Sequence, residues 1–364
     1  MMRSIYRMLI GVVCAAAAAV ALLVAPAVGA AAVPGYFGVD FTSSTTGWVV
    51  GSDSTILRTI DGGQTWTTQY SKAGGPSLLD VCILPDAKTG WAVGASGLIL
   101  RTTNGSTWTQ VFSAALDQTV SYTSVDFVSA KVGWICGGVA AGPMQGLPRG
   151  AVYRSDDGGV TWSAPAGVIA GWCPVALDAV SATSATCAGI QRLGTIANGY
   201  NAPACLWTTD GKSWGAAATL LRPGVTQSAE IGDLKVVTSG NRVGAIVVGD
   251  YCDLLPATPT IFSGANLGAA CGYLVPATGP RQLRGLSTPT ATTAFAVGSG
   301  AASVLKSGNG GVSWSAVATP LGMNLFGVDF VDASNGYAVG RTAVSAAAMV
   351  IKTTNGASTW TAVK

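Results

Sequence analysis

Short apolar runs recur along the chain from about residue 36 onward, and each ends in a cluster of Gly, Asp, Asn, Ser or Thr. Most of these runs do not alternate strictly between apolar and polar residues, which is typical of strands buried on both faces of a sheet. No stretch after residue 35 has a helical period. The pattern therefore predicts an all-β protein built from many short strands separated by turns.

Three short motifs recur in a fixed order. An apolar–Asp–apolar run such as Val39-Asp40-Phe41 precedes Gly-Trp with small apolar residues and Gly, clearest at 47–51, 90–94 and 133–137. Softer copies of the second motif lie at 187–189, 247–249, 295–298 and 337–340. A turn containing Asp or Asn and Gly, closed by Thr/Ser-Trp, follows each of them, as at 58–66. One copy of this turn is eroded, at 260–266.

The motifs define repeats with four short strands each and a period of roughly 42 to 60 residues, as in propeller blades. We predict a single seven-bladed β-propeller with four antiparallel strands per blade. Repeats 1 to 7 span about 36–70, 76–113, 121–166, 173–219, 227–277, 281–318 and 324–364.

Most of the distinctive side chains have a structural role in this scheme. The turn Asp accepts hydrogen bonds from its own backbone, and each Trp is an apolar plate between adjacent blades. The residues assigned to this role are Trp48, Trp66, Trp91, Trp108, Trp134, Trp162, Trp214, Trp314, Trp360, Asp61, Asp157 and Asp210.

The unit at 90–108, Gly-Trp-Ala-Val-Gly followed by Ile-Leu-Arg-Thr-Thr-Asn-Gly and Thr-Trp, resembles the repeat of the photosystem II stability/assembly factor family. That family belongs to the BNR, or Asp-box, propellers, and the resemblance covers about residues 36–364. It implies a seven-bladed, exported, non-enzymatic protein that binds protein partners. A basic stripe before the turn is kept in part, as Arg58, Arg101, Arg154, Lys306 and Lys352, with Trp207 in repeat 4.

Residues 1–32 have the features of a secretory signal peptide. Arg3 and Arg7 precede an apolar, Ala-rich core, and small residues offer a cleavage site near Ala30 or Ala32. The alternative is an uncleaved membrane anchor. The net charge is only +3, so we expect no nucleic-acid binding. We expect a secreted or cell-envelope protein that is monomeric.

Seven cysteines remain after cleavage, and export makes disulfides plausible. We predict two pairs that staple neighbouring loops, Cys187 with Cys205 and Cys252 with Cys271. The chain has no histidine and no Cys-x-x-Cys spacing, so we predict no metal site.

The sequence offers little for catalysis. Glycoside hydrolysis needs two carboxylates, but Glu230 is the single glutamate in the chain. The aspartates recur once per repeat and are better explained as structural: Asp40, Asp80, Asp126, Asp178, Asp233 and Asp329. Without histidine, Ser-His-Asp and Cys-His mechanisms are excluded. We predict no catalytic residue and no cofactor; the alternative is a carbohydrate-binding or sialidase-like Asp-box propeller.

Binding is assigned to the places where the repeats differ. Repeats 3, 4 and 5 carry insertions between their second and third strands, at about 138–150, 190–204 and 250–260. Equivalent loops share one face of a propeller, and binding residues concentrate on such loops. The candidates are Met144, Arg149, Arg192, Tyr200, Asn201, Tyr251 and Asp253. The expected partner is a protein or a cell-envelope component, with a glycan as the alternative.

Overall fold

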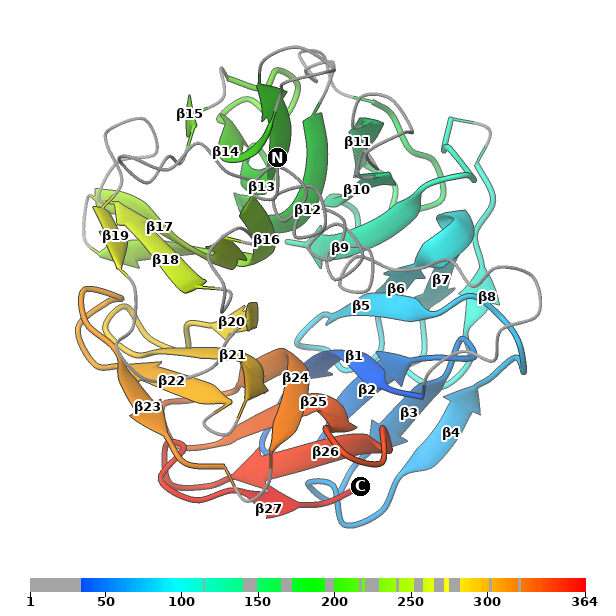
Figure 1. Ribbon diagram of the computed structural model, residues 1–364. Coiled ribbons are helices and arrows are strands. Elements are labelled where there is room, and N and C mark those ends of the chain that lie inside the picture. Colours follow the sequence, from blue (N-terminus) through cyan, green and yellow to red (C-terminus); the bar gives the residue numbers. More distant parts are fainter. Residues whose placement is uncertain are drawn as a thin grey trace, which may run out of the picture.

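A computed structural model describes residues 34–113, 115–139, 149–164, 172–193, 200–215, 218–219, 229–239, 242–251, 258–264, 272–274, 282–300, 303–319 and 322–364. The regular structure in these ranges is β-strand, apart from one short 3-10 turn, η1 (Ala95–Gly97). The sheets are antiparallel and stand around a common centre (Figure 1). The chain is thus an all-β, propeller-like protein, as the apolar pattern predicted.

The first four repeats give these strands: β1 (Tyr36–Phe41), β2 (Gly47–Gly51), β3 (Ile56–Thr59), β4 (Thr67–Tyr70), β5 (Leu78–Ile83), β6 (Gly90–Gly94), β7 (Ile99–Thr102), β8 (Thr109–Gln110), β9 (Ser121–Phe127), β10 (Gly133–Val139), β11 (Arg149–Ser155), β12 (Trp172–Ser181), β13 (Ser184–Leu193), β14 (Tyr200–Thr208) and β15 (Ala218–Thr219). Repeat 3 forms a three-stranded sheet, which an isolated bridge from Arg154 to Ser163 extends.

The last three repeats give β16 (Ala229–Ser239), β17 (Arg242–Tyr251), β18 (Thr258–Gly264), β19 (Gly272–Leu274), β20 (Gln282–Ser287), β21 (Ala294–Gly300), β22 (Val304–Ser307), β23 (Ser315–Val317), β24 (Met323–Phe330), β25 (Gly336–Thr342), β26 (Ala348–Thr353) and β27 (Thr361–Ala362). Strands β20 to β27 form one eight-stranded sheet, because β21 pairs briefly with β24 at Ser299 and Gly300.

The N-terminal strand belongs to its own repeat. Tyr36 pairs with Gly51 of β2, and β27 pairs with β26 at the other end of the chain. Each terminal repeat is therefore in phase with the sequence motifs, and Tyr36 does not add a strand to the last repeat. Residues 31–33 lie outside the described residues.

The apolar core is divided into clusters between neighbouring sheets. Phe41 stacks on Tyr337 with ring centroids 3.5 Å apart, and Trp91 stacks on Phe127 at 3.4 Å. Both pairs join an inner strand to the Gly-Trp position of an adjacent repeat. A Cβ on Gly47 would overlap the Phe41 ring, which explains why glycine precedes the aromatic residue there. The repeated Gly-Trp run is thus a packing device between repeats.

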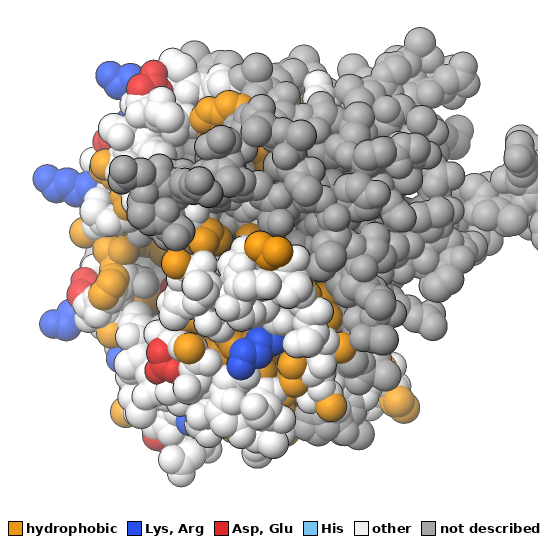
Figure 2. All heavy atoms as spheres, turned by 90° about the vertical axis from the view of Figure 1, so that its left-hand side faces the viewer, with side chains coloured by type: hydrophobic (Ala, Val, Ile, Leu, Met, Phe, Trp, Pro, Cys, Tyr) orange, Lys and Arg blue, Asp and Glu red, His pale blue; other side chains and the backbone are white. Residues whose placement is uncertain are grey.

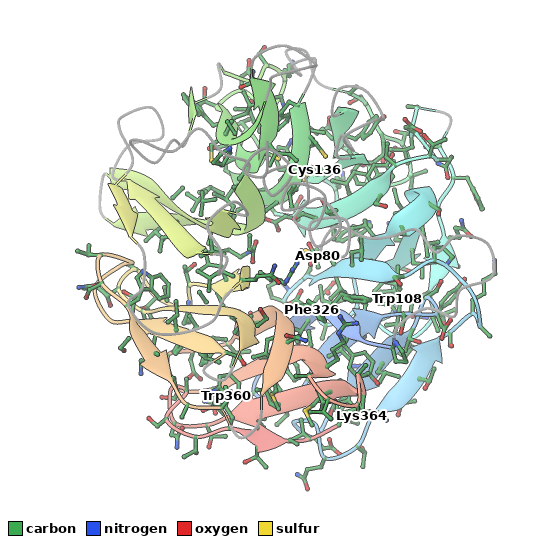
Figure 3. The ribbon with its side chains drawn as sticks, in the orientation of Figure 1. Asp80, Trp108, Cys136, Phe326, Trp360 and Lys364 are labelled. Atoms are coloured by element: carbon green, nitrogen blue, oxygen red, sulfur yellow. The ribbon has the colours of Figure 1, made fainter. Side chains whose placement is uncertain are left out.

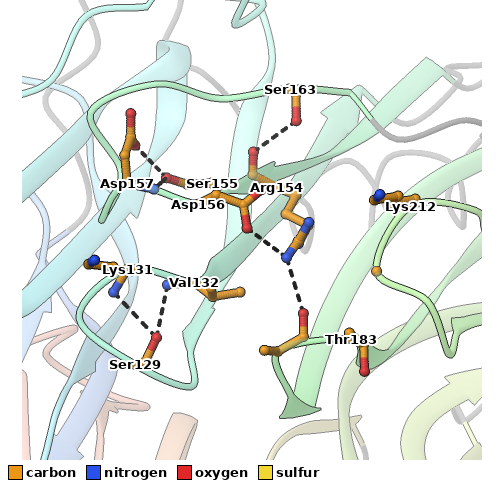
Figure 4. Close-up of polar contacts among 12 residues, drawn as sticks. Ser129, Lys131, Val132, Arg154, Ser155, Asp156, Asp157, Ser163, Thr183 and Lys212 are labelled. Carbon is orange, nitrogen blue, oxygen red and sulfur yellow. Dashed lines mark hydrogen bonds and ion pairs between the residues drawn. The ribbon is translucent and has the colours of Figure 1, made fainter.

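In the six repeats whose turn after the third strand is described, that turn is held by its own side chains. In repeat 3, Asp157 accepts hydrogen bonds from the backbone N–H of Thr161 at 2.9 Å and from its hydroxyl at 2.6 Å. The Ser155 hydroxyl donates to the same carboxylate at 2.9 Å (Figure 4). Asp61 makes the same contacts with Thr65, which lower the pKa of its carboxyl to about 2. Asn309 takes the same place in repeat 6, where it accepts from Ser313 N–H.

The structure contradicts one predicted disulfide. Cys187 pairs across the sheet with Leu206, whereas Cys205 pairs with Ala188. Register neighbours share a face and the next residue faces the other way, so the two sulfurs point to opposite faces of the sheet. Cys187 packs with Cys136 on one side. The prediction of a Cys187–Cys205 disulfide is therefore wrong. The other predicted pair lies outside the described residues: Cys252 and Cys271.

Candidate functional site at the centre of the ring

The first strands of the repeats meet around the centre of the molecule. Contacts run from β1 through β5, β9, β12, β16, β20 and β24 back to β1 (Figure 1). Among the labelled side chains of Figure 3, Asp80 and Phe326 lie near this centre, whereas Trp108 and Trp360 lie farther out. The first strand of each repeat, which we call its inner strand, is thus the strand that contacts the same strand of both neighbouring repeats.

One position of each inner strand, opposite the Trp of the Gly-Trp motif, forms a set that we call the inner ring: Asp40, Cys82, Asp126, Asp178, Lys235, Ser287 and Asp329. Asp126 accepts the backbone N–H of Ala179 at 2.7 Å, and Asp329 accepts that of Phe41 at 2.8 Å. Each carboxylate thereby holds the inner strand of the next repeat. The bond from Asp329 to Phe41 joins the last repeat to the first.

Three members of the inner ring depart from Asp. Cys82 Sγ accepts the N–H of Phe127 at 3.4 Å, and Ser287 Oγ accepts that of Phe330 at 3.0 Å. Lys235 has no acceptor atom, and it forms an ion pair with Asp178 at 3.2 Å instead. Two residues earlier on the same strand, Asp233 accepts the N–H of Leu286 at 2.8 Å and links repeat 5 to repeat 6.

Burial dominates the electrostatics of these carboxyls. It raises the pKa of Asp126 and of Asp233 to about 7, and that of Asp329 to about 6. Burial alone would lower the pKa of Lys235, but the surrounding carboxylates, first Asp178, raise it well above its usual value. Lys235 is therefore the counter-charge of the ring, and its side chain is 34% exposed against 17% for Asp178.

The inner ring serves the contacts between repeats. The inner-ring carboxylates are occupied by backbone N–H groups, whereas a glycosidase pair faces a substrate. Glu230 lies in β16 opposite Asp250 of β17, and its side chain lies outside the described part of the chain. Within that part, no three His, Cys, Asp or Glu residues are placed to hold a metal ion.

The basic stripe also serves the contacts between repeats. Lys352 lies over the ring of Tyr337 and donates to the carbonyl of Gly62 at 3.1 Å, which joins repeat 7 to repeat 1. Lys306 donates in the same way to Gly356 at 2.9 Å. Arg154 donates to the carbonyl of Ala182 at 3.2 Å and pairs with Asp156 (Figure 4). These cations are thus committed to neighbouring repeats rather than to a partner.

Every inner strand carries a β-bulge near its start, at one and the same repeat position. The bulge residues are Phe37, Leu79, Thr123, Val175, Gly232, Arg284 and Phe326. A bulge releases one residue from strand pairing and re-aims its side chain. The seven residues are partly exposed, although buried positions flank most of them. They form the variable surface of the inner strands.

Two bulge side chains meet at the junction of repeats 6, 7 and 1. The rings of Phe37 and Phe326 are 5.3 Å apart, and the guanidinium carbons of Arg284 and Arg341 lie 5.9 Å and 5.5 Å from the Phe326 ring centre. We call these four residues the Phe326 cluster. Sequence reasoning missed it, although the residue three positions before the inner-ring residue differs between the repeats, as Phe37, Leu79 and Arg284 show.

The sequence-predicted binding residues lie at the same edge of the sheets. Val139 pairs with Arg149 at the border of the first insertion, just beyond the bulge at Thr123. The other two borders end in the same direction: Arg192 is paired with Asn201, Leu193 with Tyr200, and Tyr251 with Thr258. Only the backbone of these candidates is described. Two further candidates lie outside the described residues: Met144 and Asp253.

Charged side chains are scattered over the described surface. In the view of Figure 2, isolated basic and acidic side chains stand among uncharged ones and small apolar patches. No helix of the described residues is long and apolar enough to span a membrane. The described surface in this view therefore has no basic face of the kind that binds a phosphate backbone.

No protein-family model matches the sequence, and no curated protein sequence matches it. Solved structures do match. A structure of YCF48 bound to D1 peptide aligns with 20% identity and a TM-score of 0.58, over 85% of this chain and 91% of the other. YCF48 from Cyanidioschyzon merolae aligns with 18% identity and a TM-score of 0.57, over 88% and 95%.

An enzyme shares the architecture. Virginiamycin B lyase from Staphylococcus aureus aligns with 12% identity and a TM-score of 0.58, over 84% of this chain and 92% of the other. At such identities the likeness carries the fold and not the activity. The chain thus has the all-β propeller-like fold that is found in YCF48, in agreement with the resemblance seen in its repeats.

Proposed function

We propose that the protein is an exported, monomeric, non-catalytic seven-bladed propeller that binds a segment of another protein. Its binding face is the edge of the ring that carries the inner-strand bulges and the three insertions. Residues 1–32 serve as the export signal in this proposal.

The closed circuit of inner strands supports seven blades. Starting from Asp329 and Phe41, hydrogen bonds between neighbouring inner strands occur at every junction of the seven repeats. The eight-stranded sheet then consists of two blades, β20–β23 and β24–β27, that share a short edge contact.

Two observations support the absence of catalysis. The recurrent carboxylates accept hydrogen bonds from the backbone of the next repeat, which removes them from a substrate. One structure of the similar virginiamycin B lyase is of a catalytically inactive variant in which a histidine is replaced by alanine. This chain contains no histidine.

The observation that carries the binding proposal is the concentration of irregular features at one edge. The bulge residues and the borders of all three insertions lie there, whereas the described turns of the opposite edge, such as those of Asp61 and Asp157, are short and internally bonded. The YCF48 structure bound to a peptide adds support for a protein segment as the ligand.

Affinity capture from the native envelope tests this proposal. The bait is the mature chain, compared with a variant in which 140–148, 194–199 and 252–257 are replaced by short turns. A matched control carries Lys88→Gln and Lys131→Gln, two exposed residues of the opposite edge. We expect a protein that the wild type and the control retain and that the shortened variant loses. Equal capture by all three chains would contradict the proposed face.

The alternative function is activity on a polysaccharide, because an ulvan lyase structure also aligns with this chain, with a TM-score of 0.55. A panel of ulvan, sialoside and other glycoside substrates discriminates the two functions. Turnover that Glu230→Gln abolishes would replace the binding proposal with an enzymatic one.

A further inference from the structure

The Phe326 cluster combines two cations with two apolar rings at the proposed binding edge. Phe37 and Phe326 come from β1 and β24, whereas Arg284 and Arg341 come from β20 and β25. All four side chains are partly exposed. The neighbouring positions Leu283 and Leu325 are buried, so the cluster stands on a packed base.

The backbone fixes the place of this cluster. The bulges at Phe37, Arg284 and Phe326 release these residues from pairing with their second strands. A Cβ on Gly327 would lie 2.7 Å from the carbonyl oxygen of Phe37, and one on Gly285 would lie 3.0 Å from that of Phe326. The glycines thus let the three inner strands approach closely, which brings the bulge side chains together.

The charges of the cluster call for an anion. Both guanidinium carbons lie within about 6 Å of the Phe326 ring centre, the range of a cation–π contact, and the cation of Arg341 so placed favours a negative group beside it. Arg284 bonds Gln282 at 2.9 Å, and no carboxylate of the described residues forms an ion pair with Arg341. Asp329 lies three residues after Phe326 in β24, which is about 10 Å along the strand, and its carboxylate accepts the Phe41 N–H.

We propose that the Phe326 cluster binds a carboxylate of an acidic peptide segment, with an adjacent apolar side chain of that segment against Phe37 and Phe326. This inference rests on the proposed function and names the chemistry of its ligand. Guanidinium forks match carboxylates in geometry. The hydroxyls of a sugar need acceptors as well as donors, but the guanidiniums of the cluster only donate, and the Gln282 amide oxygen is engaged by Arg284.

Peptide selection with the full mature chain tests the inference. A random dodecapeptide library is displayed on phage, and enriched peptides are synthesised and titrated by calorimetry. We expect enriched peptides with Asp or Glu beside Leu, Ile or Phe. Arg341→Gln is expected to weaken their binding about tenfold or more, since it removes a charge-assisted bond. Arg341→Lys, which keeps the charge, is expected to recover part of that loss.

A double-mutant cycle identifies the contact. Replacing the acidic residue of the peptide by its amide is expected to weaken binding to the wild type, with little further loss in Arg341→Gln. Lys131→Gln, on the opposite edge, is the matched control and should change affinity less than twofold. Melting temperatures of the variants show whether they are folded.

The outcomes of these experiments distinguish failure of this inference from failure of the proposed function. Enriched peptides without an acidic residue would overturn the proposed ligand chemistry. Binding by Arg341→Gln and by Arg284→Gln that is as tight as binding by the wild type would do the same. In both cases the proposed peptide-binding face would stand. Absence of any enriched peptide together with absence of any captured protein would overturn the proposed function itself. Binding of a glucuronic-acid tetrasaccharide without binding of any peptide would identify the ligand of the cluster as an acidic glycan. It would therefore refute the proposal of a peptide ligand.

Discussion

The junction between repeats 7 and 1 and the junction between repeats 5 and 6 differ in an instructive way. At the first, where repeat 7 packs against repeat 1, Asp329 holds Phe41 N–H, Lys352 reaches Gly62, and the Tyr337 hydroxyl donates to the Ser44 carbonyl at 2.8 Å. At the second, which is continuous in sequence, Lys235 stands where the other repeats have an acceptor, and Asp233 supplies the link to Leu286.

The contacts at a junction therefore depend on the residues at its repeat positions and not on whether the two repeats are consecutive in the sequence. Repeats 6, 7, 1, 2 and 3 keep an aromatic residue at the Gly-Trp position and a basic residue before the turn. Repeats 4 and 5 have Thr186 and Ile246 at the first position, and Trp207 and Ser263 at the second. The arc that lost these links is also the one that carries two of the three insertions. Loss of these links and two of the insertions thus coincide in the arc of repeats 4 and 5, whereas the Phe326 cluster lies in the regular arc.

Replacement of the aromatic plate should have the largest effect in the regular arc. Trp91 has no exposed surface, stacks on Phe127 and donates to the Gly158 carbonyl at 2.9 Å. Trp91→Ala is expected to lower the free energy of unfolding by about 3–5 kcal/mol, because it empties a buried site between repeats. Thr186→Ala, at the same repeat position, should cost about 1 kcal/mol. Urea unfolding measures both, and equal losses would abolish the distinction between the arcs.

The counter-charge between repeats 4 and 5 should come next. Lys235→Met leaves Asp178 and its neighbours without a cation, and the partial exposure of the pair limits the loss to about 2 kcal/mol at pH 8. The loss should shrink at pH 5.5, because carboxyls such as Asp233 are then protonated. Lys131→Met, an exposed control, should change stability by less than about 0.5 kcal/mol. A loss independent of pH would show that Lys235 acts through packing rather than charge.

The buried carboxyls of the inner strands should make the wild type more stable in mild acid. Burial raises the folded-state pKa of Asp126 and Asp233 to about 7, above the unfolded value of 3.8. The folded chain therefore binds more protons than the unfolded chain between these values, and its stability rises as the pH falls from 8 to 5. We expect a melting temperature several degrees higher at pH 5.5 than at pH 8. Asp233→Asn should flatten this slope, and a slope of the opposite sign would refute the role of the buried carboxyls.

The smallest effect should separate two adjacent aspartates of one turn. Asp157 holds the backbone N–H and hydroxyl of Thr161, whereas Asp156 pairs with Arg154 at the surface (Figure 4). Asp157→Ala is expected to cost about 1 kcal/mol, and Asp156→Ala less than about 0.5 kcal/mol. Thermal unfolding of the two variants checks the order, and a reversed order would show that the turn bonds do not support the scaffold.

The sequence by itself determined the β class, the repeats and the turns. These features depend on local chemistry: glycine where an aromatic ring must pass, Asp or Asn where a turn lacks hydrogen-bond acceptors, and short apolar runs between them. The insertions were also visible, because any departure from a repeat can be read against its other copies.

Register and the meeting of distant strands were decided only by the tertiary structure. The predicted Cys187–Cys205 disulfide failed because a shift of one residue between paired strands moves a side chain to the other face. The basic stripe is visible in the sequence, but only the structure shows that Lys352 and Arg154 donate to carbonyl groups of the neighbouring repeat. The Phe326 cluster unites Phe37 with Phe326, nearly the whole chain apart, through bulges that arise from strand pairing. A local pattern cannot contain such a contact, since closure of the ring creates it.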